Sequence, residues 1–267
     1  MFANLGRRVI TAAILGPLAL AAIVAGGPWL LALVAVAAVL LLLEWRGMTG
    51  VPASPVLCGG LAAVLLAALL AAEFGMPAQS GELWPVAAGL LVAGLVLEAV
   101  WRRGLPWTLL GLAWVAVPCV ALLALRQEAA GMWLLIWVFV AVAGCDTGAY
   151  FAGKAIGGPK LAPRVSPNKT WAGLLGGMAL AGLASAALAL PSGLASPVVL
   201  AALGALLAVV SQVGDLAQSA VKRHYDVKDS GSLLPGHGGL FDRVDGLLFA
   251  VPATLLISQT TQAQVIS

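Results

Sequence analysis

Residues 132–152 read MWLLIWVFVAVAGCDTGAYFA, an apolar run interrupted by a single charged residue, Asp146. A run of about 20 apolar residues is long enough to cross a bilayer as a helix. Lipid offers no hydrogen-bond partner to the backbone, so a segment of this kind spans a membrane only as a helix. An aspartate inside such a helix indicates a functional site. The alternative is that Asp146 is only a partner for a basic residue.

The whole chain has the composition of this one segment. Of its 267 residues, 61% are hydrophobic and 9% are charged, against about 25% charged in soluble domains. A soluble protein of this length could not hide so much apolar surface in one core. The net charge of +3 does not indicate nucleic-acid binding, because no soluble basic domain carries it. Cys58, Cys119 and Cys145 are too widely spaced for a disulfide framework or a zinc site.

Breaks containing glycine or proline divide the chain into apolar segments, so we expect an all-α, polytopic integral membrane protein with about nine transmembrane helices. The first segment follows two arginines, as a signal peptide would, but the next begins almost at once, and we expect a retained helix. We divide the chain into an N-terminal region of five spans, 1–130, and a C-terminal catalytic region of four, 131–267. The segments are 9–26, 28–43, 56–72, 84–101, 107–125, 132–152, 172–190, 197–214 and 245–258.

The basic residues indicate the orientation of these segments. With the N-terminus inside and nine alternating spans, every one of the 14 lysines and arginines except Arg126 falls on the cytoplasmic side. This bias follows the positive-inside rule. It places the C-terminus outside and both long polar loops, 153–171 and 215–244, in the cytoplasm of a bacterial-type inner membrane.

The stretch from Asp215 to Asp245 is unlike a plain linker, because it holds five of the eleven acidic residues and both histidines. Asp242 and Asp245 are three residues apart, which places them on one face of a helix. Together with Asp215 they offer the hard oxygen ligands that suit Mg²⁺. The alternative for Asp242 or Asp245 is that it caps the start of the last helix.

Basic and glycine residues share this stretch with the acids. Lys222, Arg223, Lys228 and Arg243 are candidates for binding phosphate, although the positive-inside bias also explains them. The turn 235–239 reads PGHGG, and its backbone N–H groups could approach an anion. His237 within it could donate to a phosphate. A simple turn is the alternative.

A second polar group follows Asp146 in the sequence. Arg164 and Lys169 could meet an anionic head group or a nucleotide phosphate. Ser166 and Thr170 could supply hydroxyl donors, or could merely cap the helix that follows. Trp171 is typical of an interfacial anchor.

On these motifs the chain resembles the phosphatidate cytidylyltransferases, or CDP-diacylglycerol synthases. Their motif runs Ser, any residue, an aliphatic residue, Lys-Arg, four residues, Lys-Asp, then Pro-Gly-His-Gly-Gly and Asp-Arg-x-Asp. The chain matches it from Ser219 to Asp245. The stretches 146–150 and 166–171 also match, and Glu44-Trp45 matches more weakly. Two residues depart from the family pattern. Gln218 stands where Glu is common, and Ala172 stands where Glu or Gln is common.

The resemblance implies a reaction in which CTP and phosphatidic acid give CDP-diacylglycerol and pyrophosphate with Mg²⁺. It implies a site, with a second cation left open, in which Asp215, Asp242, Asp245 and Asp146 hold metal. Lys222, Arg223, Lys228 and Arg243 would bind CTP phosphates, and Lys169 and Arg164 the lipid phosphate. The remaining expected catalytic and substrate-binding residues are His237, Ser166, Thr170, Ser219, Asp229, Gly238 and Gly239.

Other functions fit the sequence less well. The CDP-alcohol phosphatidyltransferase motif begins like residues 242–246, but it continues with further aspartates, and 247–267 has no acidic residue. A transporter would place polar groups near the midplane and show repeats. An enzyme acting on another lipid phosphate, such as an archaeal ether lipid, remains open, as does a homodimer.

Overall fold

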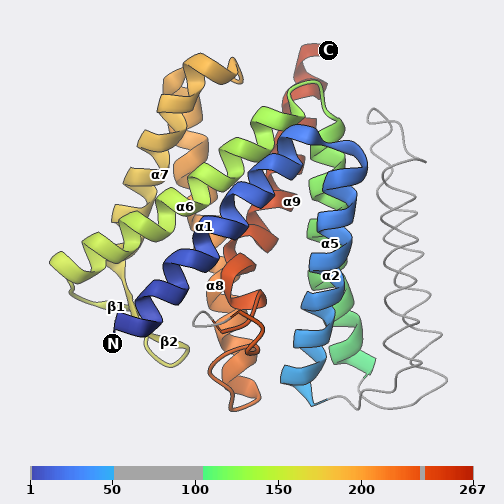
Figure 1. The fold of residues 1–267 in the computed structure, drawn as a ribbon. Coiled ribbons are helices and arrows are strands. Elements are labelled where there is room, and N and C mark those ends of the chain that lie inside the picture. The colour runs from blue at the N-terminus through green and yellow to red at the C-terminus, as the bar shows by residue number, and fades with distance from the viewer. Residues whose placement is uncertain (1, 51–104, 235–237, 267) are drawn as a thin grey trace. The chain divides into compact units, whose positions relative to one another are not determined.

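The computed structural model describes residues 2–50, 105–234 and 238–266 (Figure 1). Within these ranges the predicted apolar segments form helices, and five of the helices are long and apolar enough to cross a membrane. This confirms a polytopic helical membrane protein. The predicted spans 56–72 and 84–101 lie outside the described residues. The helices are α1 (Phe2–Ala25), α2 (Gly27–Thr49), α5 (Leu105–Gln127), α6 (Gly131–Ala155), α7 (Trp171–Ser192), α8 (Pro197–His224) and α9 (Phe241–Ile266).

Contacts divide the chain into two compact units. The first consists of Met1–Gln127 and Val227–Val244, and the second of Glu128–Asp226 and Asp245–Ser267. The polar connection between α8 and α9 therefore packs with the N-terminal helices, which its position in the sequence does not indicate.

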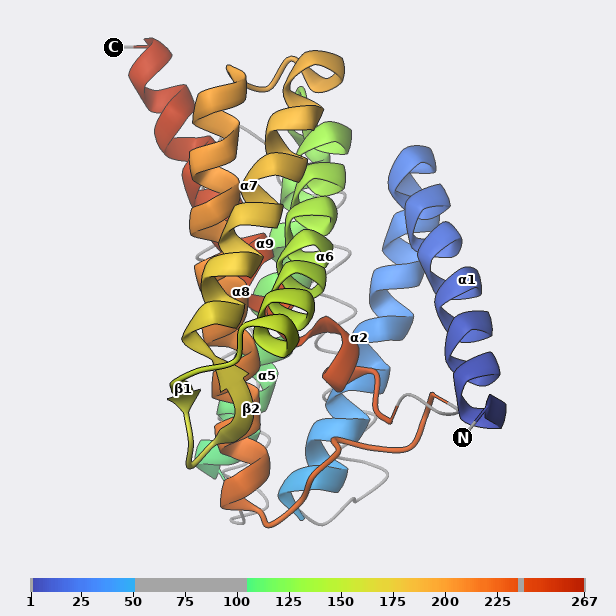
Figure 2. The same ribbon diagram turned by 90° about the vertical axis from the view of Figure 1, so that its left-hand side faces the viewer.

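The connection between α6 and α7 contains a small antiparallel hairpin that the sequence analysis did not predict. Its strands are β1 (Lys160–Ala162) and β2 (Ser166–Thr170), with Lys160 opposite Thr170 and Ala162 opposite Ser166. Figure 2 shows it at the end of the α6 and α7 helices. Because Lys169 lies on a strand, its backbone is held by the ladder rather than left in an irregular loop.

The predicted loop 215–244 is wrong in its limits. α8 continues to His224 and α9 begins at Phe241, so only 225–240 connects them. Asp215, Ser219 and Lys222 recur at helical spacing, which gives this part of α8 a polar stripe without ending the helix. Hydropathy falls at the last apolar residue, whereas the helix continues to His224, so hydropathy places the end of α8 too early.

In the second unit, small residues let the helices pack closely (Figure 2). A Cβ atom added to Gly148 of α6 would overlap the backbone of Gly176 on α7. One added to Gly204 of α8 would overlap the side chain of Ser185 on α7. The indole N–H of Trp137 donates to the Ser185 hydroxyl at 2.9 Å. Association of helices in lipid depends on such close packing and interhelical hydrogen bonds.

In the first unit, the core is built around Trp45 of α2, which is 2% exposed. Its indole N–H donates to the carbonyl of Trp107 at 2.9 Å. Its ring lies 5.5 Å from that of Trp114 and 5.8 Å from that of Phe241, measured between centroids. Phe241 is fully buried, so this contact fixes the start of α9 within the unit.

Thr170 caps α7, the structural alternative that the sequence left open for it. Its hydroxyl oxygen accepts a hydrogen bond from the Gly173 N–H at 3.0 Å. Thr170→Ala should lower the stability by about 1 kcal/mol, because it leaves a buried donor at the helix start unsatisfied. Thermal unfolding in detergent measures this. Thr170→Ser keeps the hydroxyl, so its stability should stay within a few tenths of a kcal/mol of the wild type. An equal loss of stability in both variants would contradict the capping role.

Candidate active site

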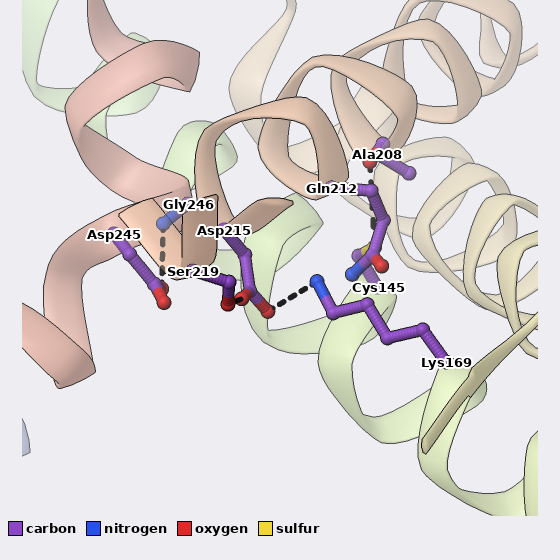
Figure 3. A network of polar contacts seen from close by, with 8 residues as sticks. All are labelled: Cys145, Lys169, Ala208, Gln212, Asp215, Ser219, Asp245 and Gly246. Atoms are coloured by element: carbon purple, nitrogen blue, oxygen red, sulfur yellow. Dashed lines mark hydrogen bonds and ion pairs between the residues drawn. The ribbon is translucent and has the colours of Figure 1, made fainter. Parts of the chain in front are cut away.

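The second unit brings a group of charged side chains together around Asp215 of α8. One carboxylate oxygen of Asp215 lies 2.5 Å from the Lys169 ammonium nitrogen of β2. The other accepts a hydrogen bond from the Ser219 hydroxyl, one turn further along α8, at 3.4 Å. Figure 3 shows the three side chains converging from the helix and the strand. The Lys169 and Asp215 side chains are only 18% and 29% exposed, so this ion pair is largely shielded from solvent.

Asp245 and Asp146 complete this group. Asp245 accepts the N–H of Gly246 at 2.8 Å (Figure 3), and the charges of Asp215, Asp146 and Lys169 all act on its carboxyl group. Helices α8 and α9 can approach here because residue 214 is glycine. A Cβ atom at Gly214 would lie 2.7 Å from the Asp245 carbonyl oxygen. We call Asp146, Lys169, Asp215, Ser219 and Asp245 the Asp215 cluster.

The Asp215 cluster contains three carboxylates and one ammonium group, drawn from α6, α8, α9 and β2. No group of three or more His, Cys, Asp or Glu side chains in the described ranges is already arranged to hold a metal ion. However, Mg²⁺ binds through one or two carboxylates and completes its shell with water and substrate phosphates. Hard carboxylate oxygens therefore fit this ion chemically. Metal binding by Asp146, Asp215, Asp242 and Asp245 stays a prediction.

The first unit holds a second group of polar side chains, around Glu44 of α2. The Glu44 carboxylate is 9% exposed and accepts hydrogen bonds from the backbone N–H groups of Leu240 and Phe241, both at 2.8 Å. It also accepts the hydroxyl of Ser230 at 3.2 Å. Sequence reasoning gave Glu44 only a weak family match and no role. The one sequence feature that could have indicated a role for Glu44 is its position as an acidic residue at the end of an apolar run.

Asp242 lies in the first unit and accepts two backbone N–H groups, those of Ser230 at 2.8 Å and Gly239 at 3.3 Å. Both donors lie before the start of α9 at Phe241, so these two bonds hold the preceding connection and do not cap the helix, the alternative that the sequence left open for Asp242. Gly238, with φ of 82°, adopts a backbone conformation that favours glycine, and its carbonyl accepts the Leu234 N–H. A Cβ atom at Gly238 would lie 3.3 Å from an Asp242 carboxylate oxygen and 3.7 Å from the Asp229 side chain.

The other predicted site residues are distributed as follows. Lys222 and Arg223 lie in the last turn of α8, where positive charge also complements the helix dipole. Arg164, Arg223, Lys228, Asp229 and Arg243 are exposed. Ser166 begins β2. His237 lies outside the described residues. Binding of phosphate by these residues stays a prediction.

Comparison with known proteins gives consistent matches. A family model described as "Cytidylyltransferase family" matches residues 6–261. A protein named phosphatidate cytidylyltransferase from Pseudomonas aeruginosa is 38% identical over 266 residues, which cover 93% of this chain and 94% of that protein. One of the same name from Brucella suis is 50% identical over 169 residues, 61% of each chain. The chain thus spans about three fifths of the length of the Brucella relative that it matches.

Proposed function

Since this chain belongs to the cytidylyltransferase family, we propose that it is a phosphatidate cytidylyltransferase, which condenses CTP with phosphatidic acid. A phosphate oxygen of the lipid attacks the α-phosphorus of CTP and forms a new P–O bond. The bond from that phosphorus to the bridging oxygen of the β-phosphate breaks. CDP-diacylglycerol forms, and the bonding electrons leave with pyrophosphate.

The observation that carries this proposal is the Asp215 cluster itself. The lipid phosphate is already a nucleophile, so the reaction needs no separate nucleophilic side chain. What it needs is that two polyanions approach each other and that the charge on the leaving pyrophosphate is stabilised. A carboxylate group beside a largely shielded lysine supplies ligands for cations and one fixed positive charge at the same place.

A divalent cation held by these residues would supply positive charge that stabilises the phosphate groups during the reaction. In the second unit Asp215, Asp245 and Asp146 are the proposed ligands, and the sequence motif adds Asp242. The Ser219 hydroxyl orients the Asp215 carboxylate through its hydrogen bond. We keep a single Mg²⁺ as the proposed ion, with a second cation open.

The basic residues then divide between the two substrates. Lys169, already beside Asp215, and Arg164 on the same connection are proposed to bind the phosphatidate head group. Lys222, Arg223, Lys228 and Arg243 are proposed to bind the phosphates of CTP, for which guanidinium and ammonium groups are well suited, and the last three are exposed. The positive-inside bias supports a site that faces the cytoplasm, where CTP is available.

The proposed function predicts that the purified protein in detergent, given CTP and phosphatidic acid, forms CDP-diacylglycerol and pyrophosphate in equal amounts. Chelation of divalent cations should stop the reaction, and added Mg²⁺ should restore it. ATP, GTP and UTP in place of CTP test the nucleotide. An ether-linked lipid phosphate tests the alternative substrate. Equal rates with all four nucleotides, or no lipid product with CTP, would contradict the proposal.

A further inference from the structure

Glu44 is a buried carboxylate whose hydrogen-bond partners among the described residues lie in one segment, between Ser230 and Phe241. Burying a carboxylate is costly unless donors replace its hydration. Here two donors are backbone N–H groups at the start of α9, where the helix dipole also favours negative charge. The third is the Ser230 hydroxyl, within the connection between α8 and α9. The same carboxylate therefore joins Ser230 to the start of α9.

The loop is shaped around this carboxylate. A Cβ atom at Gly239 would lie 2.6 Å from one Glu44 oxygen and would also overlap the Ser230 hydroxyl. A Cβ atom at Gly231 would lie 3.0 Å from the other Glu44 oxygen. These glycines are needed because the backbone passes so close to the carboxylate.

Asp242 also accepts hydrogen bonds from the residues that contact Glu44 or lie next to them. Ser230 donates its hydroxyl to Glu44 and its backbone N–H to Asp242, so both carboxylates fix one residue. Gly239 donates its N–H to Asp242, and the next two N–H groups go to Glu44. These donors are turned inward onto carboxylates. The exposed basic side chains Lys228 and Arg243, on either side of these residues, are the ones already proposed to bind phosphate.

We propose that Glu44 is a positioning residue that pre-shapes residues 230–231 and 239–243 for the triphosphate of CTP. The proposal rests on the proposed function for the identity of the ligand. Glu44 acts through the loop and makes no contact with substrate: it fixes the backbone from which Asp242 and Arg243 project. A loop that is ordered before binding loses less conformational entropy when CTP binds, so the effect falls on CTP affinity.

Glu44→Gln tests this proposal. The amide has one acceptor oxygen, and its NH₂ group would face N–H or O–H donors, so at least one loop contact must be lost. We expect the amides of Leu240 and Phe241 to exchange with deuterium at least about tenfold faster, since their bonding partner is impaired. We also expect the KM for CTP to rise about tenfold while the KM for phosphatidic acid changes less than about twofold. Glu44→Asp, which keeps the charge, should recover part of the CTP affinity.

Two further variants separate positioning from folding. Leu43→Ala, at the neighbouring position on α2 with a side chain that is 49% exposed, should change neither exchange in 230–243 nor either KM. Ser230→Ala removes the hydrogen bond from the Ser230 hydroxyl and keeps the Glu44 carboxylate. If Glu44→Gln does not fold, this variant tests whether the bonds to Glu44 position the segment. It should raise the KM for CTP about two- to fivefold.

The outcomes are distinguishable. Unchanged exchange at 240–241 in Glu44→Gln would overturn the positioning role, whatever the substrate. Faster exchange with an unchanged KM for CTP, or an equal rise in both KM values, would overturn the link to CTP. A wild-type protein without CTP-dependent product would instead refute the proposed function, and with it the identity of the ligand, while the exchange result still decides whether Glu44 orders the loop.

Discussion

Asp215→Asn is expected to lower the formation of CDP-diacylglycerol at least about a hundredfold while the protein still inserts into the membrane. Asparagine keeps the shape of the side chain but removes the negative charge beside Lys169. It also removes a proposed ligand of the divalent cation. Radiolabelled CTP incorporated into lipid measures the rate, and the amount of detergent-extracted monodisperse protein measures folding. Full activity would remove Asp215 from the proposed site.

Asp226→Asn is the matched control for this prediction. Asp226 is an exposed aspartate just beyond the end of α8. It belongs neither to the Asp215 cluster nor to the polar side chains around Glu44, and the change from aspartate to asparagine is the same. Its φ of 54° is also tolerated by asparagine. Activity should stay within about twofold of wild type.

A double variant separates two explanations of an Asp215→Asn defect. If Asp215 served only to neutralise Lys169, then Asp215→Asn with Lys169→Met would recover activity, because no unpaired charge remains. If Asp215 binds the cation and Lys169 the lipid phosphate, the double variant stays at least as inactive as the single one. We expect the second result.

Gly148→Ala is expected to lower the midpoint of thermal unfolding by about 4–10 °C, corresponding to an overpacking cost of about 1–3 kcal/mol. The added methyl group would overlap the carbonyl oxygen of Gly176 and lie 2.9 Å from its carbonyl carbon. Backbone atoms cannot rotate away, so α6 and α7 must separate. Asp146 lies on α6, and β2 with Lys169 leads into α7, so the Asp215 cluster should also be disturbed.

Gly47→Ala is the matched control, for which no loss of thermal stability is expected. No heavy atom lies within 4 Å of a Cβ atom built at Gly47, which is exposed on α2. Alanine is the better helix former by about 1 kcal/mol, so the midpoint should stay the same or rise. Equal destabilisation in the two variants would show that the close approach of α6 and α7 is not what Gly148 provides. Thermal unfolding and loss of monodisperse protein in detergent measure both variants.

The helices were predictable because their signal is local. Segments such as 132–152 and 172–190 are apolar enough that lipid alone requires a helix, and α6 and α7 contain them. The end of α8 was not predictable in this way, because a helix can continue with a polar stripe where hydropathy falls. The hairpin of β1 and β2 was missed because 160–170 is short and polar and shows no clear alternation.

From the sequence, candidate site residues could be named, but their arrangement in space could not. The spacing within 215–245 selected the acids and bases by their chemistry. It could not show that Lys169 pairs with Asp215, or that Asp242 accepts backbone N–H groups while Asp245 joins Asp215.

By itself, the sequence determined that this protein lies in a membrane, which segments form the apolar helices and which family it resembles, because hydropathy and motif spacing are patterns of neighbouring residues. Only the tertiary structure decided the hydrogen-bond partners of Glu44, since Ser230 and Phe241 are 186 and 197 residues away along the chain. A carboxylate has no partner preference that depends on its place in the sequence. Its bonds are set by which donors packing brings within hydrogen-bonding distance.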